Sequence, residues 1–228
     1  MGSDPLFLCF DTSAAHCAAA VFEGDVMRAA EIEEMTHGQG EALMPMLEWA
    51  LRRAGVDLAD LTALGVGVGP GNFTGTRISV ATARGLSLAL GCPAVSVSSF
   101  DLMRDPSGYG AEPAELVSVP APRGQAYVQH FRYGTPRAAP RLIDPAEPPQ
   151  DLRLPVNMRV TGYRAAEIAR AFAAAHGNAE LTEIPYRLGK VVDWKWGNGI
   201  DRDVRPAPLY VRPPDAAPAA DPPPHLLP

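Results

Sequence analysis

The chain has 228 residues, of which 46% are hydrophobic and 20% are charged, and its formal net charge at pH 7 is -6. This length is sufficient for one large domain or two small lobes, and the apolar fraction can fill a core. An acidic chain lacks the basic face with which nucleic-acid-binding proteins displace counterions, so we do not expect it to hold nucleic acid by itself.

The opening residues and the cysteines indicate the compartment. The segment MGSDPLFLCFDTS has no basic region of the kind that opens a secretory signal, and no stretch reaches the roughly 18 unbroken apolar residues of a spanning helix. We therefore expect a cytoplasmic protein. Cys9, Cys17 and Cys92 show neither a CxxC pair nor a ligand-like spacing. We expect them to be buried and reduced, without a disulfide or a zinc site.

The first hundred residues alternate strand-like and helix-like patterns. Apolar runs flank the turn-forming segment DTSAAH and predict a β-hairpin. The predicted elements are strands 6–10, 17–22 and 27–35, helix 40–54, strand 63–68, helix 74–90 and strand 94–97. In the first helix, apolar residues recur at three- and four-residue steps. This order predicts an α/β lobe with a mixed sheet over residues 1–104.

Beyond residue 104 the periodicity weakens, and we predict a second, smaller α/β lobe over residues 105–212. Its predicted elements are strands 115–119, 126–132 and 158–161 and a helix at 164–176. Six prolines predict a loop-rich connection over residues 135–155. The tail, residues 213–228, is rich in proline and alanine and is predicted to be disordered, because it lacks the apolar content to fold.

The segment LGVGVGPGNFTGTR, residues 64–77, runs a strand-like stretch through a glycine-rich turn into a helix. We call residues 69–77 the glycine corner. Backbone N–H groups and the positive end of a helix dipole meet there, so it could cradle an anion. It could equally be a tight turn in which Asn72 or Thr74 caps the helix. Because it lacks the GK[ST] ending of a P-loop and the GxGxxG pattern, we favour the supporting role and leave anion binding open.

Four segments together resemble the TsaB (YeaZ) family: DTS, HGQGEALMP, GPGNFTGTRISVATARGLSLALG and PLYVRPPD. The resemblance implies the two-lobed fold shared by actin, sugar kinases and Hsp70-type ATPases (the ASKHA fold), an α/β fold with mixed β-sheets flanked by helices. It also implies a non-catalytic partner of TsaD, the subunit that transfers a threonylcarbamoyl group to the adenosine following the anticodon of tRNA. TsaE would join a larger complex as an ATPase, and TsaC or its longer relative would supply the threonylcarbamoyl adenylate.

A metal site of the kind that TsaD uses needs two histidines four residues apart on one helix face. The corresponding stretch pairs His37 with Glu41 instead, so we predict no metal site there. The residues also predict no complete catalytic site, because no serine lies in a GxSxG-type elbow.

Nucleotide-binding members of this fold hold phosphates on hairpin turns and adenosine on a glycine-rich loop. This chain has no Gly-Gly pair, and its first hairpin turn contains no glycine. The candidate nucleotide-contacting residues are Asp11, Thr12, Gly71 and Arg77. For Asp11, Thr12 and Ser13 we favour a turn closed by hydrogen bonds from side chain to backbone. We expect no cofactor bound by this chain alone, and a nucleotide at the interface with TsaD stays open.

The two long helices carry more apolar surface than one core needs. In the first, Met44, Leu47 and Leu51 can share one face, while Met46 and Trp49 spread around another. The second has small residues that permit close helix approach. TsaB proteins pair with TsaD through these helices and many self-associate when alone, so the resemblance implies a heterodimer, with a homodimer in isolation and tRNA reached through the complex. The predicted interface residues are Leu43, Met44, Leu47, Leu51, Arg77, Val80, Ala81, Arg84, Gly85 and Leu88.

Three alternatives stay open. Lys190, Trp194, Lys195 and Trp196 form a basic and aromatic cluster that could touch tRNA, although nearby aspartates favour a solvated, partly packed segment. A small ATPase or phosphotransferase would use Asp11 and the glycine corner. A homodimeric glycoprotease-like peptidase would need a hydrolytic site that the sequence does not display.

Overall fold

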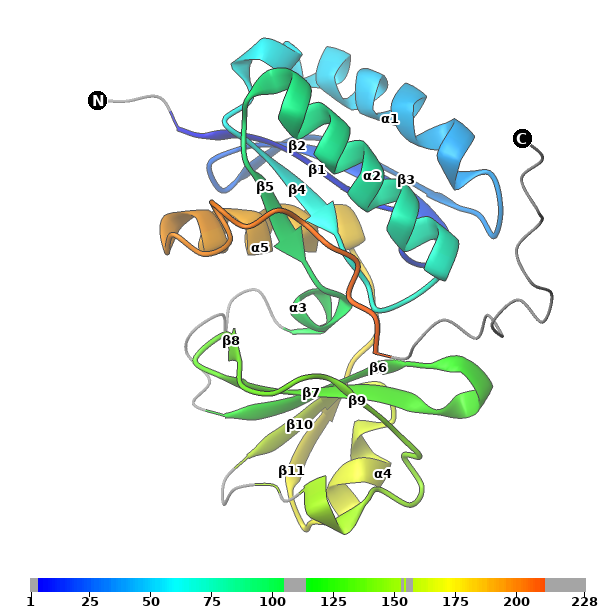
Figure 1. The fold of residues 1–228 in the computed structure, drawn as a ribbon. Helices are drawn as coiled ribbons and strands as arrows, with labels where there is room; N and C mark the ends of the chain where they lie inside the picture. Colours follow the sequence, from blue (N-terminus) through cyan, green and yellow to red (C-terminus); the bar gives the residue numbers. More distant parts are fainter. Residues whose placement is uncertain (1–3, 105–113, 153, 155–157, 212–228) are drawn as a thin grey trace, which may run out of the picture.

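The computed structural model describes residues 4–104, 114–152, 154 and 158–211. Two β-sheets lie one above the other in Figure 1, and each has helices packed against it. The predicted α/β class with mixed sheets flanked by helices is therefore confirmed. No helix within these ranges is both long and apolar enough to cross a membrane.

The first sheet has the strand order β3-β2-β1-β4-β5. Its strands are β1 (Leu6–Asp11), β2 (His16–Glu23), β3 (Val26–Glu34), β4 (Ala63–Gly67) and β5 (Ala94–Val97). The first three form an antiparallel meander, and β4 and β5 add parallel to β1. The central strands are buried along almost their whole length, which explains why they appear in the sequence as continuous apolar runs.

Helices cover both faces of this sheet. The helices α1 (Gln39–Ala54) and α2 (Phe73–Leu90) pack on one face, and α5 (Ile184–Gly197) packs on the other (Figure 1). Side chains alternate along β1 between the two resulting cores. Leu8 and Phe10 lie in the core under α1 and α2, whereas Phe7 and Cys9 lie in the core under α5.

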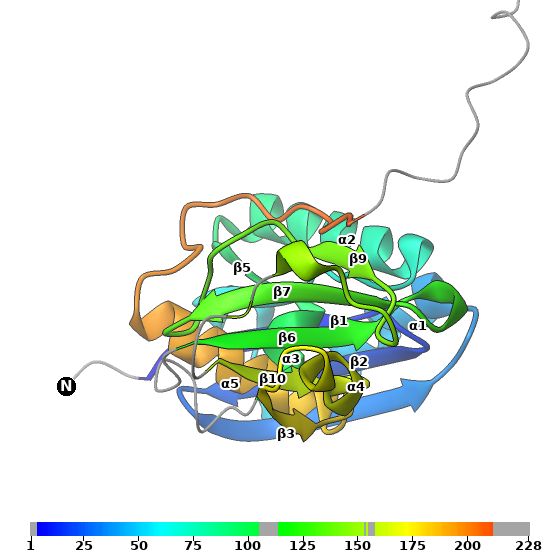
Figure 2. The same ribbon diagram turned by 90° about the horizontal axis from the view of Figure 1, so that it is seen from below.

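The second sheet has the order β11-β10-β6-β7-β8, with β9 paired to β7. Its strands are β6 (Glu115–Pro120), β7 (Ala126–Arg132), β8 (Thr135–Pro136), β9 (Arg141–Ile143), β10 (Arg159–Gly162) and β11 (Ala175–Asn178). The short helix α4 (Ala165–Arg170) covers its outer face, as the view from below in Figure 2 shows. On the inner face, α3 (Ser99–Met103) contributes Phe100 and Met103 to a core shared with β6 and β7.

Three short 3-10 helices complete the described elements of the chain: η1 (Leu58–Asp60), η3 (Pro122–Gly124) and η4 (Gln150–Leu152). The last of these, with β8 and β9, lies within the connection that the prolines predict to be loop-rich. The predicted disordered tail, residues 213–228, lies outside the described residues.

The packing of the C-terminal residues differs from the predicted domain boundaries. Residues 105–212 are predicted to form the second lobe, yet α5 packs against β1, β2 and β3 of the first sheet. Leu209 also packs against the core under α1 and α2. The apolar side chains of α5 cover the second face of the first sheet, where Leu102 of α3 also packs. The first lobe is thus built from both ends of the chain.

Two further predictions need correction. The helix predicted at 164–176 ends at Arg170, and β11 follows at Ala175–Asn178. The parallel pairing of β11 with β10 overrides the helix propensity of the alanine-rich segment, and Ala173 turns the chain with a φ of 50°. Helix α5 was not predicted, because Gly189 interrupts its apolar pattern. That glycine lets α5 approach β2 closely, since a Cβ there would overlap the ring of Phe22.

Candidate functional site

The glycine corner packs directly on the first hairpin turn. Thr12 Oγ1 donates a hydrogen bond to the carbonyl oxygen of Gly75 at 2.6 Å, and the Asn72 N–H donates to the carbonyl oxygen of Ser13 at 2.6 Å. A Cβ at Gly71 would overlap the Ser13 carbonyl oxygen, and a Cβ at Gly75 would overlap that of Thr12. Glycine is therefore needed at these positions for close approach of one backbone to another.

The amides of Thr74, Gly75 and Thr76 in the first turn of α2 already have partners. Asn72 caps the helix, since its Oδ1 accepts from the N–H groups of Thr74 at 3.0 Å and Gly75 at 3.2 Å. The N–H of Thr76 donates to the Asn72 carbonyl oxygen. These amides are the donors that an anion at a helix N-terminus would use. Their occupation supports the capping role of the glycine corner, and Asn72 is the capping residue.

Asp11 is buried at the end of β1, with 1% of its surface exposed. Its Oδ1 accepts from the Ser13 N–H at 2.7 Å, and its Oδ2 lies 3.2 Å from Nε2 of His16. A Cβ at Gly67 would overlap the carboxylate. The favoured turn, closed by a hydrogen bond from side chain to backbone, is therefore observed for Asp11, whereas the Thr12 hydroxyl donates to Gly75 outside the turn. In this arrangement Asp11 holds the hairpin and does not face an open site.

Residues that bind metals or act as nucleophiles are sparse in the described part of the chain. Within it, no group of three histidine, cysteine, aspartate or glutamate side chains is placed to hold a metal ion. The three cysteines are free and buried, as predicted. Burial, with Glu33 and Asp11 nearby, raises the pKa of the Cys17 thiol to about 11. Burial also raises the pKa of Cys9 and Cys92, so these thiols are poor nucleophiles at neutral pH.

The predicted basic and aromatic cluster belongs mostly to the packing of α5. Lys195 is buried and its Nζ lies 3.0 Å from Oδ2 of Asp101 and 2.8 Å from the carbonyl oxygen of Ser96. The ring of Trp196 packs edge-on against Phe7 at a centroid distance of 5.9 Å. Burial opposes the ionisation of Asp101, but the Lys195 ammonium and the hydrogen bonds from Ser98 outweigh it and lower the pKa. The segment is therefore partly packed: Lys195 is buried, and Lys190, Trp194 and Trp196 keep part of their surface exposed.

The two faces of α1 and α2 differ sharply, and burial corrects part of the predicted interface. Four of its residues lie in the core between the helices and the first sheet: Leu43, Leu47, Leu51 and Val80. Their side chains point inward because they supply the single apolar stripe that α1 and α2 need to cover the sheet. A partner cannot reach them without unfolding the lobe.

We define the outer face as the remaining predicted interface residues together with Trp49 of α1. The predicted ones are Met44 of α1 and Arg77, Ala81, Arg84, Gly85 and Leu88 of α2. Met44 is 42% exposed, Trp49 is 38% exposed and Leu88 is 86% exposed. Arg84 is half-buried, and Ala81 and Gly85 of α2 are exposed. Large exposed apolar side chains beside a helix of small residues form a surface suited to close contact with a second protein.

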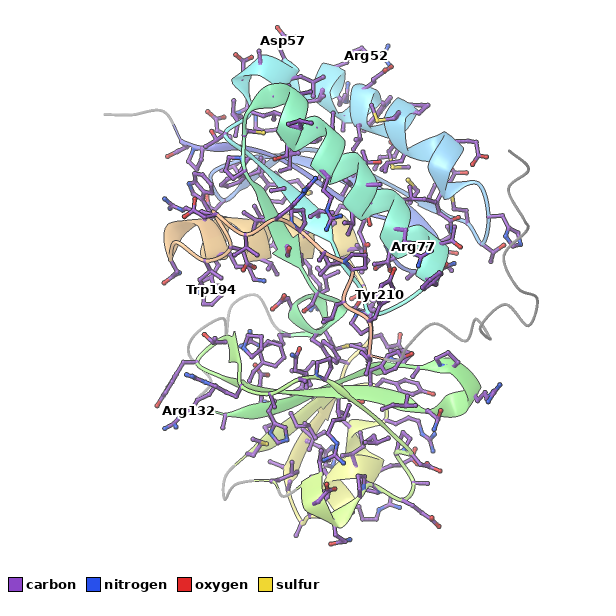
Figure 3. The ribbon with its side chains drawn as sticks, in the orientation of Figure 1. Arg52, Asp57, Arg77, Arg132, Trp194 and Tyr210 are labelled. Atoms are coloured by element: carbon purple, nitrogen blue, oxygen red, sulfur yellow. The ribbon has the colours of Figure 1, made fainter. Side chains whose placement is uncertain are left out.

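Residues 205–211, which we call the strap, run beside α2 (Figure 1). The Leu209 N–H donates to the carbonyl oxygen of Val68 at 2.8 Å, and the Leu209 side chain packs on the core. The Arg77 guanidinium carbon lies 3.6 Å from the centroid of the Phe73 ring, and Arg77 Nε donates to the Tyr210 hydroxyl at 2.8 Å. Figure 3 shows Arg77 and Tyr210 side by side. Tyr210 belongs to the segment PLYVRPPD, and no local sequence pattern predicts a role for its hydroxyl.

A groove of about 770 Å³ lies beside the C-terminal end of α2. It is lined by Arg84, Ser87, Leu88, Gly91, Cys92, Pro93, Ala94, Trp196, Arg202, Asp203, Val204, Arg205 and Pro206. The C-terminal ends of α2 and α5 face it, and such ends carry partial negative charge. Arg202 donates to the Trp196 carbonyl oxygen at the end of α5 and so compensates that charge. This gives Arg202 a structural role in the groove.

Comparisons with known proteins agree with the fold and with the first-lobe motifs. The family model described as TsaD, tRNA N6-adenosine threonylcarbamoyltransferase, matches residues 33–149. The tRNA threonylcarbamoyladenosine biosynthesis protein TsaB of Buchnera aphidicola is 32% identical over 123 residues, which cover 54% of this chain and 58% of that protein. The TsaB protein of Escherichia coli is 36% identical over 97 residues, covering 42% of this chain and 41% of that protein.

The chain thus spans about half the length of these curated relatives. A protein from Mycobacterium tuberculosis, described as uncharacterized, is 33% identical over 180 residues, covering 79% of this chain and 78% of that protein. Among solved structures, YeaZ from Pseudomonas aeruginosa superposes with a TM-score of 0.65 at 21% identity, covering 90% of this chain and 99% of that chain.

The sugar-kinase relationship of the fold is seen in a ROK hexokinase from Thermus thermophilus. Its TM-score is 0.52 at 15% identity, and the match covers 86% of this chain and 99% of that chain. These identities are low enough that the likeness concerns the fold alone. The predicted ASKHA fold is therefore confirmed.

Proposed function

Since this chain belongs to the TsaB (YeaZ) family, we propose that it takes part in the biosynthesis of threonylcarbamoyladenosine in tRNA as the non-catalytic partner of TsaD. In this role it binds and stabilises TsaD, which transfers the threonylcarbamoyl group to the adenosine following the anticodon. TsaE joins the larger complex, and tRNA is held mainly by the other subunits. The location is the cytoplasm.

The observation that carries the proposal is the outer face of α1 and α2. Met44, Trp49 and Leu88 are exposed although they are large and apolar. Ala81 and Gly85 between them are small and exposed, and a Cβ at Gly85 would meet nothing within 4 Å. Two long helices that present such a surface can pack against two helices of a partner at short interaxial distance.

The net charge supports an indirect role toward tRNA. The chain carries a formal charge of -6, and Lys190 and Lys195 of the basic cluster are engaged by Asp25 and Asp101. An RNA-binding subunit would be expected to present free cations to phosphates. If a nucleotide binds between this chain and TsaD, Arg77 of the outer face is the residue that would contact it.

The competing hypothesis of an ATPase or phosphotransferase is disfavoured by the first hairpin. The Asp11 carboxylate already accepts from the Ser13 N–H and lies beside His16. The N–H groups of Thr74 and Gly75 already donate to the Asn72 side chain. The burial of the three thiols disfavours a peptidase that uses a cysteine nucleophile. The partner role is therefore the one that the geometry supports best.

Reconstitution tests the proposal. TsaD and TsaE from the same organism, supplied with threonylcarbamoyl adenylate and unmodified tRNA, are expected to form threonylcarbamoyladenosine only when this chain is added, as measured by mass spectrometry of the nucleosides. Equal product without this chain would overturn the proposal. Calorimetric titration of the isolated chain with ATP and magnesium is the control, and saturable binding there would favour the ATPase.

A further inference from the structure

The strap accepts one hydrogen bond from the Nε atom of each of the two arginines of α2. Arg77 Nε donates to the Tyr210 hydroxyl at 2.8 Å, and Arg84 Nε donates to the carbonyl oxygen of Pro206 at 2.8 Å. Both acceptors are neutral. Among the described residues, no carboxylate lies within ion-pair distance of either guanidinium.

The two guanidinium groups share one side of the helix. Seven residues separate them, which is about 10 Å along the axis and nearly two full turns. The Arg77 guanidinium is also held flat, 3.6 Å above the Phe73 ring and 5.9 Å from that of Tyr210. The Phe73 and Tyr210 rings lie 5.3 Å apart. The strap and the aromatic rings thus fix the position of the Arg77 guanidinium, while the N–H groups of its terminal nitrogens stay available as donors.

A guanidinium fixed in this way is prepared for a bidentate acceptor. Its terminal nitrogens match the geometry of a carboxylate, and less side-chain entropy is lost when the position is already set. Each arginine lies within or beside the outer face, next to small residues of α2. Aromatic residues and arginine are the types most enriched at the centres of protein interfaces.

We propose that the TsaD-binding surface continues from α2 onto the strap, and that Arg77 and Arg84 receive two carboxylates of TsaD about 10 Å apart. Tyr210 is then a positioning residue, which sets the Arg77 fork without contacting the acid itself. This inference rests on the proposed function and adds to it the charge of the partner surface and a role for the C-terminal residues. A carboxylate fits better than an RNA phosphate, because the surrounding surface is apolar and the chain is acidic.

The test is calorimetric titration of this chain with TsaD of the same organism, in the absence of nucleotide and tRNA. We expect Arg77→Lys to weaken binding about tenfold, because lysine cannot donate as a fork. Tyr210→Phe keeps the ring and loses the acceptor, so we expect a loss of about three- to tenfold with an unchanged Tm. Arg84→Gln is expected to reduce the dependence of binding on salt.

The matched control lies in the second lobe. Arg132 and Tyr133 form an exposed cation–π pair at 5.6 Å, and Arg132→Lys and Tyr133→Phe are expected to bind TsaD like the wild type. If wild-type binding is tight and the Arg77 and Tyr210 variants bind equally well, this inference is wrong and the proposed function stands. If the wild type does not bind TsaD, the proposed function fails. A loss that appears only after tRNA is added would assign the arginines to phosphate and contradict the carboxylate.

Discussion

The inner face of α1 and α2 packs against the first sheet, whereas the outer face of the same two helices is exposed to solvent. The inner face places Leu43, Leu47 and Val80 against the first sheet, each at most 2% exposed. The outer face leaves Met44 and Leu88 in contact with solvent at 42% and 86% exposure. Hydrophobicity alone therefore does not identify an interface, because most of the large apolar residues of α1 belong to its own core.

The glycine corner explains how the outer face keeps its position. Gly71 and Gly75 allow α2 to begin in contact with the hairpin turn, and Asn72 caps it there. At the other side of α2, the strap attaches to Val68 and to both arginines. Contacts with the hairpin turn and with the strap therefore hold α2 in place, and so they fix the position of the outer face. Substitutions on the inner and outer faces should have different effects.

The largest expected effect is on the inner face. Leu47→Asp places a carboxylate in the apolar core, so we expect a loss of stability on the order of 4 kcal/mol or more and an unfolded protein by circular dichroism. Met44→Asp, on the same helix but exposed, is the matched control and is expected to fold. A cooperative thermal transition of Leu47→Asp near the wild-type Tm would contradict the assignment of this face to the core.

The second effect concerns the contact of the glycine corner with the hairpin. In Gly75→Ala, the new methyl group meets the Thr12 carbonyl oxygen, and we expect about 1–3 kcal/mol of destabilisation in urea unfolding. Gly85→Ala introduces the same group into open space on the outer face. There we expect a gain of about 0.5–1 kcal/mol, because alanine is the better helix former. Equal changes in stability for Gly75→Ala and Gly85→Ala would contradict the close contact of Gly75 with the hairpin.

A third prediction extends the comparison to the opposite face of the sheet, where Lys195 of α5 pairs with Asp101. Asp101→Asn is expected to cost on the order of 1–3 kcal/mol at pH 7. The folded pKa of Asp101 is lowered from 3.8, so its stabilising contribution is present above that pH and is lost as the pH falls through the folded value. The difference between variant and wild type should therefore shrink below about pH 4 in denaturant titrations. A constant difference from pH 7 to pH 3 would refute this origin.

The smallest effect on stability is expected on the outer face. Met44→Asp and Ala81→Glu should each change the free energy of unfolding by no more than about 0.5 kcal/mol, because neither side chain is buried. Chemical denaturation measures this. Severe destabilisation by either variant would mean that the outer face is part of the folded core.

The N-terminal part of the first lobe was predictable because its signals are local. The strands and helices up to residue 97 appear within one or two residues of their predicted ends, since apolar period, turn residues and glycine stops coincide there. After residue 105, β6, β7 and β10 also lie within one residue of their predicted bounds, whereas α5 and β11 depend on distant partners. Glycine is needed at position 189 only because the Phe22 ring packs against it. Residues 175–178 form a strand only because β10 lies next to them.

The candidate site was predictable in its chemistry and only partly in its surface. Asn72 as a cap and Asp11 as a turn residue follow from residue type and position. The assignment of Leu47 to the interface was wrong, because a sequence shows which residues are apolar and not which side of a helix meets the sheet. The contact of Tyr210 with Arg77 spans 133 residues, and no local pattern predicts it.

The central claim is that the outer face binds TsaD. Sedimentation velocity of equimolar mixtures tests it most directly, with the wild type and with Met44→Asp/Ala81→Glu, whose side chains are exposed and leave the core intact. The account predicts a heterodimer for the wild type and two separate species for the double variant, which should itself sediment as a folded protein. A double variant that forms the same heterodimer with TsaD as the wild type would contradict it.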